Sequence, residues 1–209
     1  MNVLDTLQWR YATKKFNPDK KVPEEKLAIL KEAFNLTATS YGLQPVKLLI
    51  VSDAVTKEKL LPHSWNQKQV IQASHVFVFC VETQVDENYI SRYFERVKEE
   101  RGTPDQVLSP FRQNLIKSFS GMSAEDIHAW ASKQAYLAMG NLLTVCPLIE
   151  IDACPMEGFI PEKYDEVLNL KEKQLRSVLV MPVGYRADDD MFAGFKKVRK
   201  QLEDSIIEL

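Results

Sequence analysis

The chain has 209 residues, of which 45% are hydrophobic and 27% are charged, and this composition supports one sizeable core or two small lobes and argues against disorder. Its 27 Lys and Arg residues face 29 Asp and Glu residues, so the net charge of −2 provides no general attraction for nucleic acid, and any anion site must be local. No stretch reaches the ~20 apolar residues of a membrane span and no basic segment leads an apolar one at the N-terminus, so we expect a protein that is neither exported nor membrane-bound.

The first half of the chain alternates between helix and strand patterns. The segment Asn2–Gln8 begins with a good cap and places its apolar residues on one face, which predicts a short helix. Pro23 and apolar residues at helical spacing predict an amphipathic helix that continues to Leu36. Runs of β-branched and aromatic residues predict buried strands at Val46–Val51 and His75–Val81.

A polar segment with helical periodicity follows from Asp86 to Phe119. Turn-forming residues interrupt it near Gly102–Pro104 and again at Ser109–Pro110. We interpret this segment as a mobile helical excursion.

One long helix is expected in the second half. Ser123 and Asp126 resemble a capping arrangement, and an apolar stripe then extends from Ile127 to Val145, which is typical of a central helix. Three further elements follow: a strand within Ile149–Ala153, a helix over Glu162–Leu168 and a strand over Arg176–Val183. The architecture is therefore mixed α and β.

The three cysteines and the C-terminal tail carry further information. Cys80, Cys146 and Cys154 are odd in number, lack metal-ligand spacing and lie in apolar segments, which predicts reduced core thiols and a cytoplasmic protein. The tail ends in Ile206, Ile207 and Leu209, apolar residues that a free terminus does not normally expose. We expect a partner subunit to cover them.

Two basic clusters lie at opposite ends of the sequence. The first, Arg10–Phe16, is on its own typical of a solvated surface. The second, Phe195–Arg199, would supply, if folded beside the first, the guanidinium and ammonium groups that a phosphate dianion prefers. One phosphate could then be bound between the two ends.

Three polar turns are candidates for a ligand pocket. The backbone of Ser40–Pro45 precedes a strand and could line such a pocket. The amides of Asn66–Gln69 could pair with the carbonyl and imide edge of a heterocycle, and Gly158 within Pro155–Phe159 permits close approach to a flat ligand. Each segment could equally be an ordinary loop, helix start or turn.

Together and in this order, these segments resemble the FMN-dependent nitroreductase family, especially its oxygen-insensitive nitroreductase and dihydropteridine reductase branch. The likeness covers nearly the whole chain. Its most specific pieces are Arg10 with Lys14, Ala73–Val76 at a strand start, Pro155–Phe159, and Lys197 with Arg199. The resemblance implies an α+β fold in which a central mixed, mostly antiparallel sheet is surrounded by helices. It also implies an intertwined homodimer of single-domain chains, residues 1–209, with the excursion at about 86–120 and a tail at about 200–209 reaching the partner.

The resemblance further implies an FMN site. Arg10, Lys197 and Arg199 would hold the phosphate and ribityl chain, and Lys14 would lie near the pyrimidine edge of the ring. Asn66 would bond the pyrimidine side, the Glu157 N–H would meet N5, and the partner would contribute Ser40, Tyr41 and Gly42. The cofactor-binding set is Arg10, Tyr11, Ala12, Thr13, Lys14, Ser40, Tyr41, Gly42, Asn66, Gln69, Pro155, Glu157, Gly158, Lys197 and Arg199, and the substrate-binding set is Lys14 and Phe119.

Some positions depart from the family pattern. Ala12 and Gln69 stand where that branch often has a serine and a lysine, and Tyr11 replaces a histidine. We expect FMN affinity to survive these changes and redox tuning to differ. Phe119 aligns with an aromatic residue at the substrate mouth, although packing in the core explains a helical Phe equally well.

The activity implied by the resemblance is ping-pong hydride transfer from NADH or NADPH, through FMN, to nitroaromatics, quinones or similar small acceptors. No catalytic side chain is expected, because the cofactor carries the chemistry, while Lys14 would stabilise the anionic reduced flavin. His63, His75 and His128 lack a nearby nucleophile or metal-ligand spacing, so we expect neither a hydrolase nor a metal site. The alternatives are a non-catalytic FMN-binding or flavin-sensing protein, an anion-binding scaffold without flavin, and a family member with a dedicated substrate such as a dehalogenation target or a reduced pterin.

Overall fold

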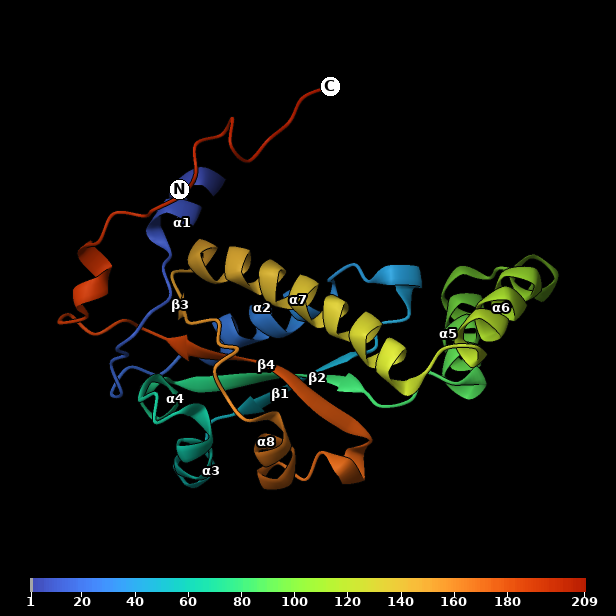
Figure 1. The fold of residues 1–209 in the computed structure, drawn as a ribbon, viewed down its shortest axis with the longest axis horizontal. Helices are drawn as coiled ribbons and strands as arrows, with labels where there is room; N and C mark the ends of the chain where they lie inside the picture. The colour runs from blue at the N-terminus through green and yellow to red at the C-terminus, as the bar shows by residue number, and fades with distance from the viewer. Residues whose placement is uncertain (1) are drawn as a thin grey trace.

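A four-stranded sheet lies at the centre of the computed structural model, which describes residues 2–209 (Figure 1). Its strands, in spatial order, are β1 (Val46–Val51), β2 (His75–Glu82), β4 (Leu175–Gly184) and β3 (Asp152–Ala153). All three ladders are antiparallel, and a parallel bridge between Ala12 and Ala153 adds the mixed element. The predicted mostly antiparallel sheet and α+β class are therefore confirmed.

The two middle strands are buried on both faces. In β2, Val78 lies opposite Leu49 of β1 on one side and Val180 of β4 on the other. Every residue from Val76 to Val81 is buried. This burial explains why β2 is almost continuously apolar in sequence and lacks the alternation of a half-exposed strand.

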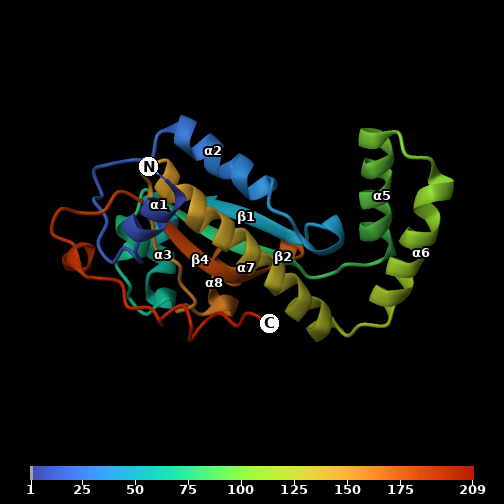
Figure 2. The same cartoon turned by 90° about the horizontal axis from the view of Figure 1, so that it is seen from above.

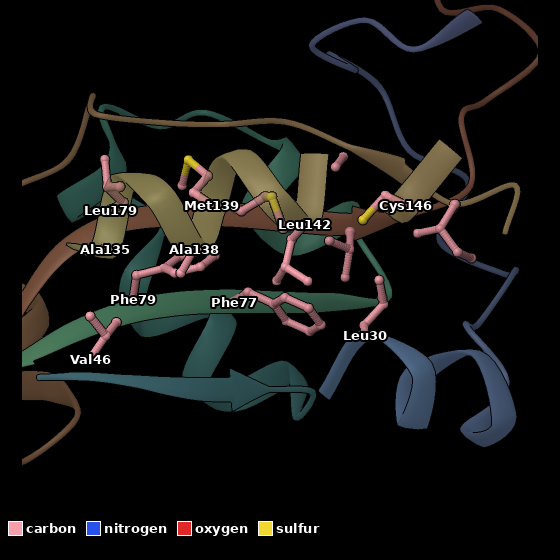
Figure 3. Close-up of a cluster of buried hydrophobic side chains, with 14 of the residues drawn as sticks. Leu30, Val46, Phe77, Phe79, Ala135, Ala138, Met139, Leu142, Cys146 and Leu179 are labelled. Carbon is pink, nitrogen blue, oxygen red and sulfur yellow. The ribbon is translucent and has the colours of Figure 1, made fainter. Parts of the chain in front are cut away.

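The long helix α7 (Ala124–Leu148) covers one face of the sheet together with α2 (Glu24–Asn35) (Figure 1). It begins at the predicted capping box of Ser123 and Asp126. Its small residues Ala135 and Ala138 let the helix approach the ring of Phe79 in β2, as Figure 3 shows. This layer forms the larger part of the core.

Short helices cover the opposite face of the sheet. They are α3 (Ala54–Leu60), α4 (Gln69–Gln72) and α8 (Pro161–Val167). Tyr164 of α8 is fully buried against this layer, and its hydroxyl lies 2.7 Å from the hydroxyl of Ser64. The sheet therefore has an apolar core on each side.

The predicted helical excursion is a hairpin of two helices, α5 (Glu87–Arg101) and α6 (Asp105–Ser120), which projects from one end of the molecule (Figures 1 and 2). Gly102 ends α5 in a left-handed conformation, which confirms the interruption predicted near Gly102–Pro104. The second predicted break is wrong, because α6 continues through Pro110. Pro110 is exposed and near the helix start, so the cost is one missing hydrogen bond that solvent can compensate.

The strand expected within Ile149–Ala153 is shorter than predicted. The helix α7 extends to Leu148, and the chain then reverses through Glu150, which has φ of 55°. The N–H groups of Ile149 and Glu150 donate to carbonyls of the last helical turn. Only Asp152 and Ala153 therefore reach the sheet.

Two short elements near the chain ends lie at the end of the molecule opposite α5 and α6. They are α1 (Val3–Trp9), capped by Asn2, and the 3₁₀ turn η4 (Met191–Gly194). After η4 the tail, residues 195–209, has no helix or strand and contains one turn, in which the Ser205 and Ile206 N–H groups donate to the Leu202 carbonyl. Ile206 and Ile207 are 54% and 86% exposed. None of the helices within residues 2–209 has the length and apolar content needed to cross a membrane.

Candidate functional site

The two basic clusters of the sequence line one surface cavity. Arg10 and Lys14 approach from the segment after α1, and Lys197 and Arg199 approach from the tail after η4. The cavity has a volume of about 410 Å³ and is also lined by Tyr11, Ala12, Phe192, Phe195 and Lys196. Residues almost 190 positions apart in sequence therefore share one cationic surface.

The charges in this cavity repel one another. Burial, followed by the positive charge of Arg199, lowers the pKa of Arg10. Burial, followed by the charges of Arg10 and Arg199, also lowers the pKa of Lys197. Because the groups disfavour one another's protonated forms, an anion bound among them relieves the repulsion. A phosphate is a suitable anion, since guanidinium and ammonium groups bind its oxygens by charge-assisted hydrogen bonds.

Asp190 fixes the backbone that carries Arg10 and Lys14. Its Oδ2 accepts hydrogen bonds from the Tyr11 hydroxyl at 2.9 Å, the Lys14 N–H at 2.9 Å and the Lys15 N–H at 3.1 Å. Burial alone would raise the pKa of this carboxyl, but the hydrogen bonds outweigh burial and hold the pKa below its ordinary value. Asp190 is therefore ionised at neutral pH and positions the loop.

A second anchor lies beneath Tyr11. The guanidinium of Arg186 lies 4.0 Å from the ring centroid of Trp9 and 4.6 Å from that of Tyr11. The buried Asp152 accepts from Arg186 Nε at 2.8 Å and from its backbone N–H at 2.9 Å. This network joins α1, the loop after α1 and strand β3, and it therefore helps to fix the segment that carries Arg10 and Tyr11.

A group of polar side chains adjoins Lys14 at the end of β3. Lys14 Nζ lies 3.9 Å from the Sγ of Cys154, and Gln69 Nε2 lies 4.0 Å from the same sulfur. Burial raises the pKa of the Cys154 thiol, which keeps it neutral. Gln69 is itself buried and also donates to Gln67 Oε1 at 3.1 Å. Lys14, Gln69 and the start of the Pro155–Phe159 turn are thus neighbours, as a shared site requires.

The turn Pro155–Phe159 lies against the Trp65–Gln67 segment. Gln67 Nε2 donates to the Gly158 carbonyl at 2.9 Å. A Cβ at Gly158 would lie 2.9 Å from the ring of Trp65, so only glycine fits without a shift. Asn66, beside Trp65, is exposed and has φ of 56°. These two turns therefore form one continuous surface.

Among the residues that the structure describes, the side chain of Glu157 has a hydrogen-bond partner, and its backbone N–H does not. Its Oε1 accepts from the Tyr136 hydroxyl of α7 at 2.7 Å. Within residues 2–209 its own backbone N–H donates no hydrogen bond. This N–H is therefore available to an acceptor on a ligand. Thr13, by contrast, is fully buried, and its N–H bonds the Ala153 carbonyl, which assigns it a place in the packing of the loop.

Ser40–Gly42 and Phe119 lie at the other end of the same chain, close to α5 and α6 (Figures 1 and 2). Tyr41 is half exposed and left-handed, and its ring centroid lies 6.2 Å from that of Phe119. The Ser40 N–H donates to Gln134 Oε1 at 2.9 Å. Phe119 is buried and packs edge-on against Trp130 at 4.9 Å. A single chain therefore does not bring these residues to the basic cavity.

Sequence reasoning missed Asp152, Asp190 and Arg186. Asp190 is the last of three consecutive aspartates, a pattern that is typical of a solvated turn. Nothing in the sequence distinguishes it from the other two. Arg186 and Asp152 are 34 positions apart, and only the antiparallel pairing of β3 with β4 brings them together.

The fold and the site together define an α+β protein with a cationic cavity beside a surface of backbone and side-chain amides. The chain belongs to the nitroreductase family, whose model matches residues 7–185. An oxygen-insensitive NAD(P)H nitroreductase of Salmonella typhimurium is 30% identical over 100% of both chains.

Solved structures share the fold at lower sequence identity. A nitroreductase family protein from Streptococcus pneumoniae has a TM-score of 0.80 and 24% identity, with 100% of each chain covered. A protein from Exiguobacterium sibiricum, solved in complex with FMN, has a TM-score of 0.85 and 18% identity, covering 100% of this chain and 98% of that one. The expected nitroreductase-like fold is therefore confirmed.

Proposed function

We propose that this chain is an FMN-dependent oxidoreductase that transfers hydride from NADH or NADPH to nitroaromatics, quinones or similar small acceptors. One observation carries the proposal: in a chain of the nitroreductase family, Arg10, Lys14, Lys197 and Arg199 converge on one cavity. The name of the Salmonella relative supports the electron donor, and the Exiguobacterium complex supports the cofactor.

The residues present fit FMN at both of its ends. The cations Arg10, Lys197 and Arg199 suit its phosphate dianion. The amides of Asn66 and Gln69 and the undonated N–H of Glu157 suit a heterocycle with carbonyl and imide groups. Gln69 stands where the nitroreductase branch that this chain resembles often has a lysine. Because Gln69 and the neutral Cys154 thiol carry no charge, Lys14 supplies the positive charge on this side of the site.

FMN, when bound, supplies the hydride chemistry, and the protein supplies position and charge. Lys14 would hold a positive charge beside the heterocycle and would stabilise negative charge on it without any proton transfer by the side chain. Asp190 holds the Lys14 backbone in place by accepting a hydrogen bond from the Lys14 N–H. The close approach of Gly158 to the Trp65 ring limits the space beside the Pro155–Phe159 turn. We further propose that donor and acceptor occupy the same space in turn, which would give a ping-pong order.

We also infer a homodimer in which the partner supplies Ser40, Tyr41 and Gly42 to the site. Their distance from the basic cavity within one chain supports this inference (Figure 2). So does the face of α7 around Tyr136 and Leu137, which are 48% and 54% exposed beside a shallow hollow of about 600 Å³. A stable homodimer would bury such apolar surface. The free buried thiols support the cytoplasmic location that we propose.

Absorbance spectroscopy tests the function. The purified protein should be yellow or become so with FMN, NADPH or NADH should bleach it without oxygen, and a nitroaromatic or quinone should restore the colour. Steady-state rates should give parallel double-reciprocal lines. A protein that takes up no FMN refutes the proposal, and a yellow protein that neither donor bleaches is a flavin-binding protein without this activity.

A further inference from the structure

A second charged cavity lies at the other end of the molecule, between α2, β1 and α5. It has a volume of about 310 Å³, and its lining includes the three cations Lys47, Arg92 and Arg96 and the two tyrosines Tyr89 and Tyr93. The acidic residue of the lining is Glu82, and Lys47 Nζ lies 3.0 Å from its Oε1. Within residues 2–209, neither Arg92 nor Arg96 has a carboxylate within 4.0 Å.

The two arginines share one side of α5. They are four residues apart, so their side chains lie one above the other on the helix, where like charges repel. Glu95 of the same helix lies 3.9 Å from Lys98 and 3.8 Å from Arg112 instead. Glu95 is therefore engaged away from the two arginines, and Arg92 lies over the ring of Tyr89, with 5.8 Å between its guanidinium carbon and the ring centroid.

Two tyrosines connect this cavity to the turn at Ser40–Gly42. Tyr89 donates to the carbonyls of Leu43 at 2.8 Å and Gln44 at 3.0 Å. Burial, followed by the charge of Glu82, raises the pKa of Tyr89 to about 12, so its phenol remains a donor. A Cβ at Gly42 would lie 2.5 Å from the Tyr93 hydroxyl. The cavity wall is thus fixed to the turn that, in the proposed dimer, serves the partner's flavin.

We propose that this cavity binds the 2′-phosphate of NADPH and makes NADPH the preferred electron donor. The inference rests on the proposed function, because only an NAD(P)H oxidoreductase would use such a site. The volume of about 310 Å³ is at the lower end of ligand pockets, about 300–1,000 Å³, so the cavity suits one end of a dinucleotide. In the proposed dimer the other end would reach the partner's flavin beyond the Ser40–Gly42 turn. Arg92 and Arg96 suit a phosphate monoester, and the rings of Tyr89 and Tyr93 suit the attached adenine. NADH lacks this phosphate, so the same cations would discriminate between the donors.

The first test uses adenosine 2′-monophosphate and adenosine as calorimetric probes of the full-length protein, which separates the cavity from the flavin reaction. The unmodified protein should bind the monophosphate about tenfold or more tightly than adenosine, and this difference should shrink with added salt. R92Q/R96Q should lose the difference. K98Q/R101Q removes the same charge from α5 outside the cavity lining and should retain it, while circular dichroism checks that both variants are folded.

The second test measures flavin reduction by stopped flow. In R92Q/R96Q the apparent Kd for NADPH should rise about tenfold or more, while the Kd for NADH should stay the same. Equal binding of the two adenosine probes, or equal effects on both donors with flavin reduction intact, would overturn this inference alone. Failure of both donors to reduce the flavin in the unmodified protein would overturn the proposed function and the role of the cavity in donor choice together.

Discussion

Asp190→Ala should destabilise the protein through the loop that carries Arg10 and Lys14. The substitution removes the acceptor of three hydrogen bonds, from Tyr11 Oη and from the N–H groups of Lys14 and Lys15. A hydrogen bond to a charged group contributes about 1.5–3 kcal/mol, and water can replace part of the loss where the donors are exposed. We expect the free energy of unfolding to fall by about 2–4 kcal/mol and Tm by on the order of 10 °C in calorimetry.

Asp189→Ala is the matched control for this change. The Asp189 side chain is 69% exposed and pairs with the exposed Lys15, so its loss should leave the free energy of unfolding and Tm essentially unchanged. The folded-state pKa of Asp190 lies below the ordinary 3.8, so its stabilisation is present above that pH and is lost as the pH falls through the folded pKa. The difference in the free energy of unfolding between Asp190→Ala and the unmodified protein should therefore be constant from neutral pH to about pH 5. It should become smaller below about pH 4. Equal Tm values for the two alanine variants would refute the anchoring role.

Three further predictions follow from the site and its surroundings. Gly158→Ala should lower the free energy of unfolding by about 1–3 kcal/mol in chemical denaturation, because the new Cβ meets the Trp65 ring. Gly194 has open space around it, so Gly194→Ala should change the free energy of unfolding little. Lys14→Ala should reduce the rate of flavin reduction, measured by stopped flow, more than it reduces FMN affinity, measured by fluorescence titration. Equal losses in the rate and in the affinity would show that Lys14 only positions the cofactor. Deletion of residues 205–209 should lower Tm without weakening FMN binding in the folded protein, and an unchanged Tm would contradict their burial against a partner.

The sequence predicts the elements whose signals are local. The capping box at Ser123 and the apolar runs of β1 and β2 carry their own evidence, and the structure confirms these elements. Pro110 and Glu150 are different, because tertiary position decides their outcome. Pro110 falls in the exposed first part of α6. Glu150 is left-handed where the chain reverses between the end of α7 and strand β3.

The site is predictable to the extent that its residues are charged and clustered in sequence. Arg10 and Lys197 attract attention as members of basic clusters, and the structure places them together. Asp152, Arg186 and Asp190 could not be found this way, since their roles depend on strand pairing and on which carboxylate of a run turns inward. The contribution of Ser40–Gly42 depends on a second chain and stays a prediction.

Comparison of FMN with riboflavin tests the phosphate site most directly, because riboflavin has the same ring and ribityl chain without the phosphate. Fluorescence titration of the flavin-free protein should show tighter binding of FMN than of riboflavin, by a factor that falls with ionic strength. In Lys197→Ala/Arg199→Ala the preference should drop by about tenfold or more, while Lys200→Ala, outside the cavity lining, should retain it. An unchanged preference for FMN in the double variant would contradict the assignment of the converging basic clusters to the flavin phosphate.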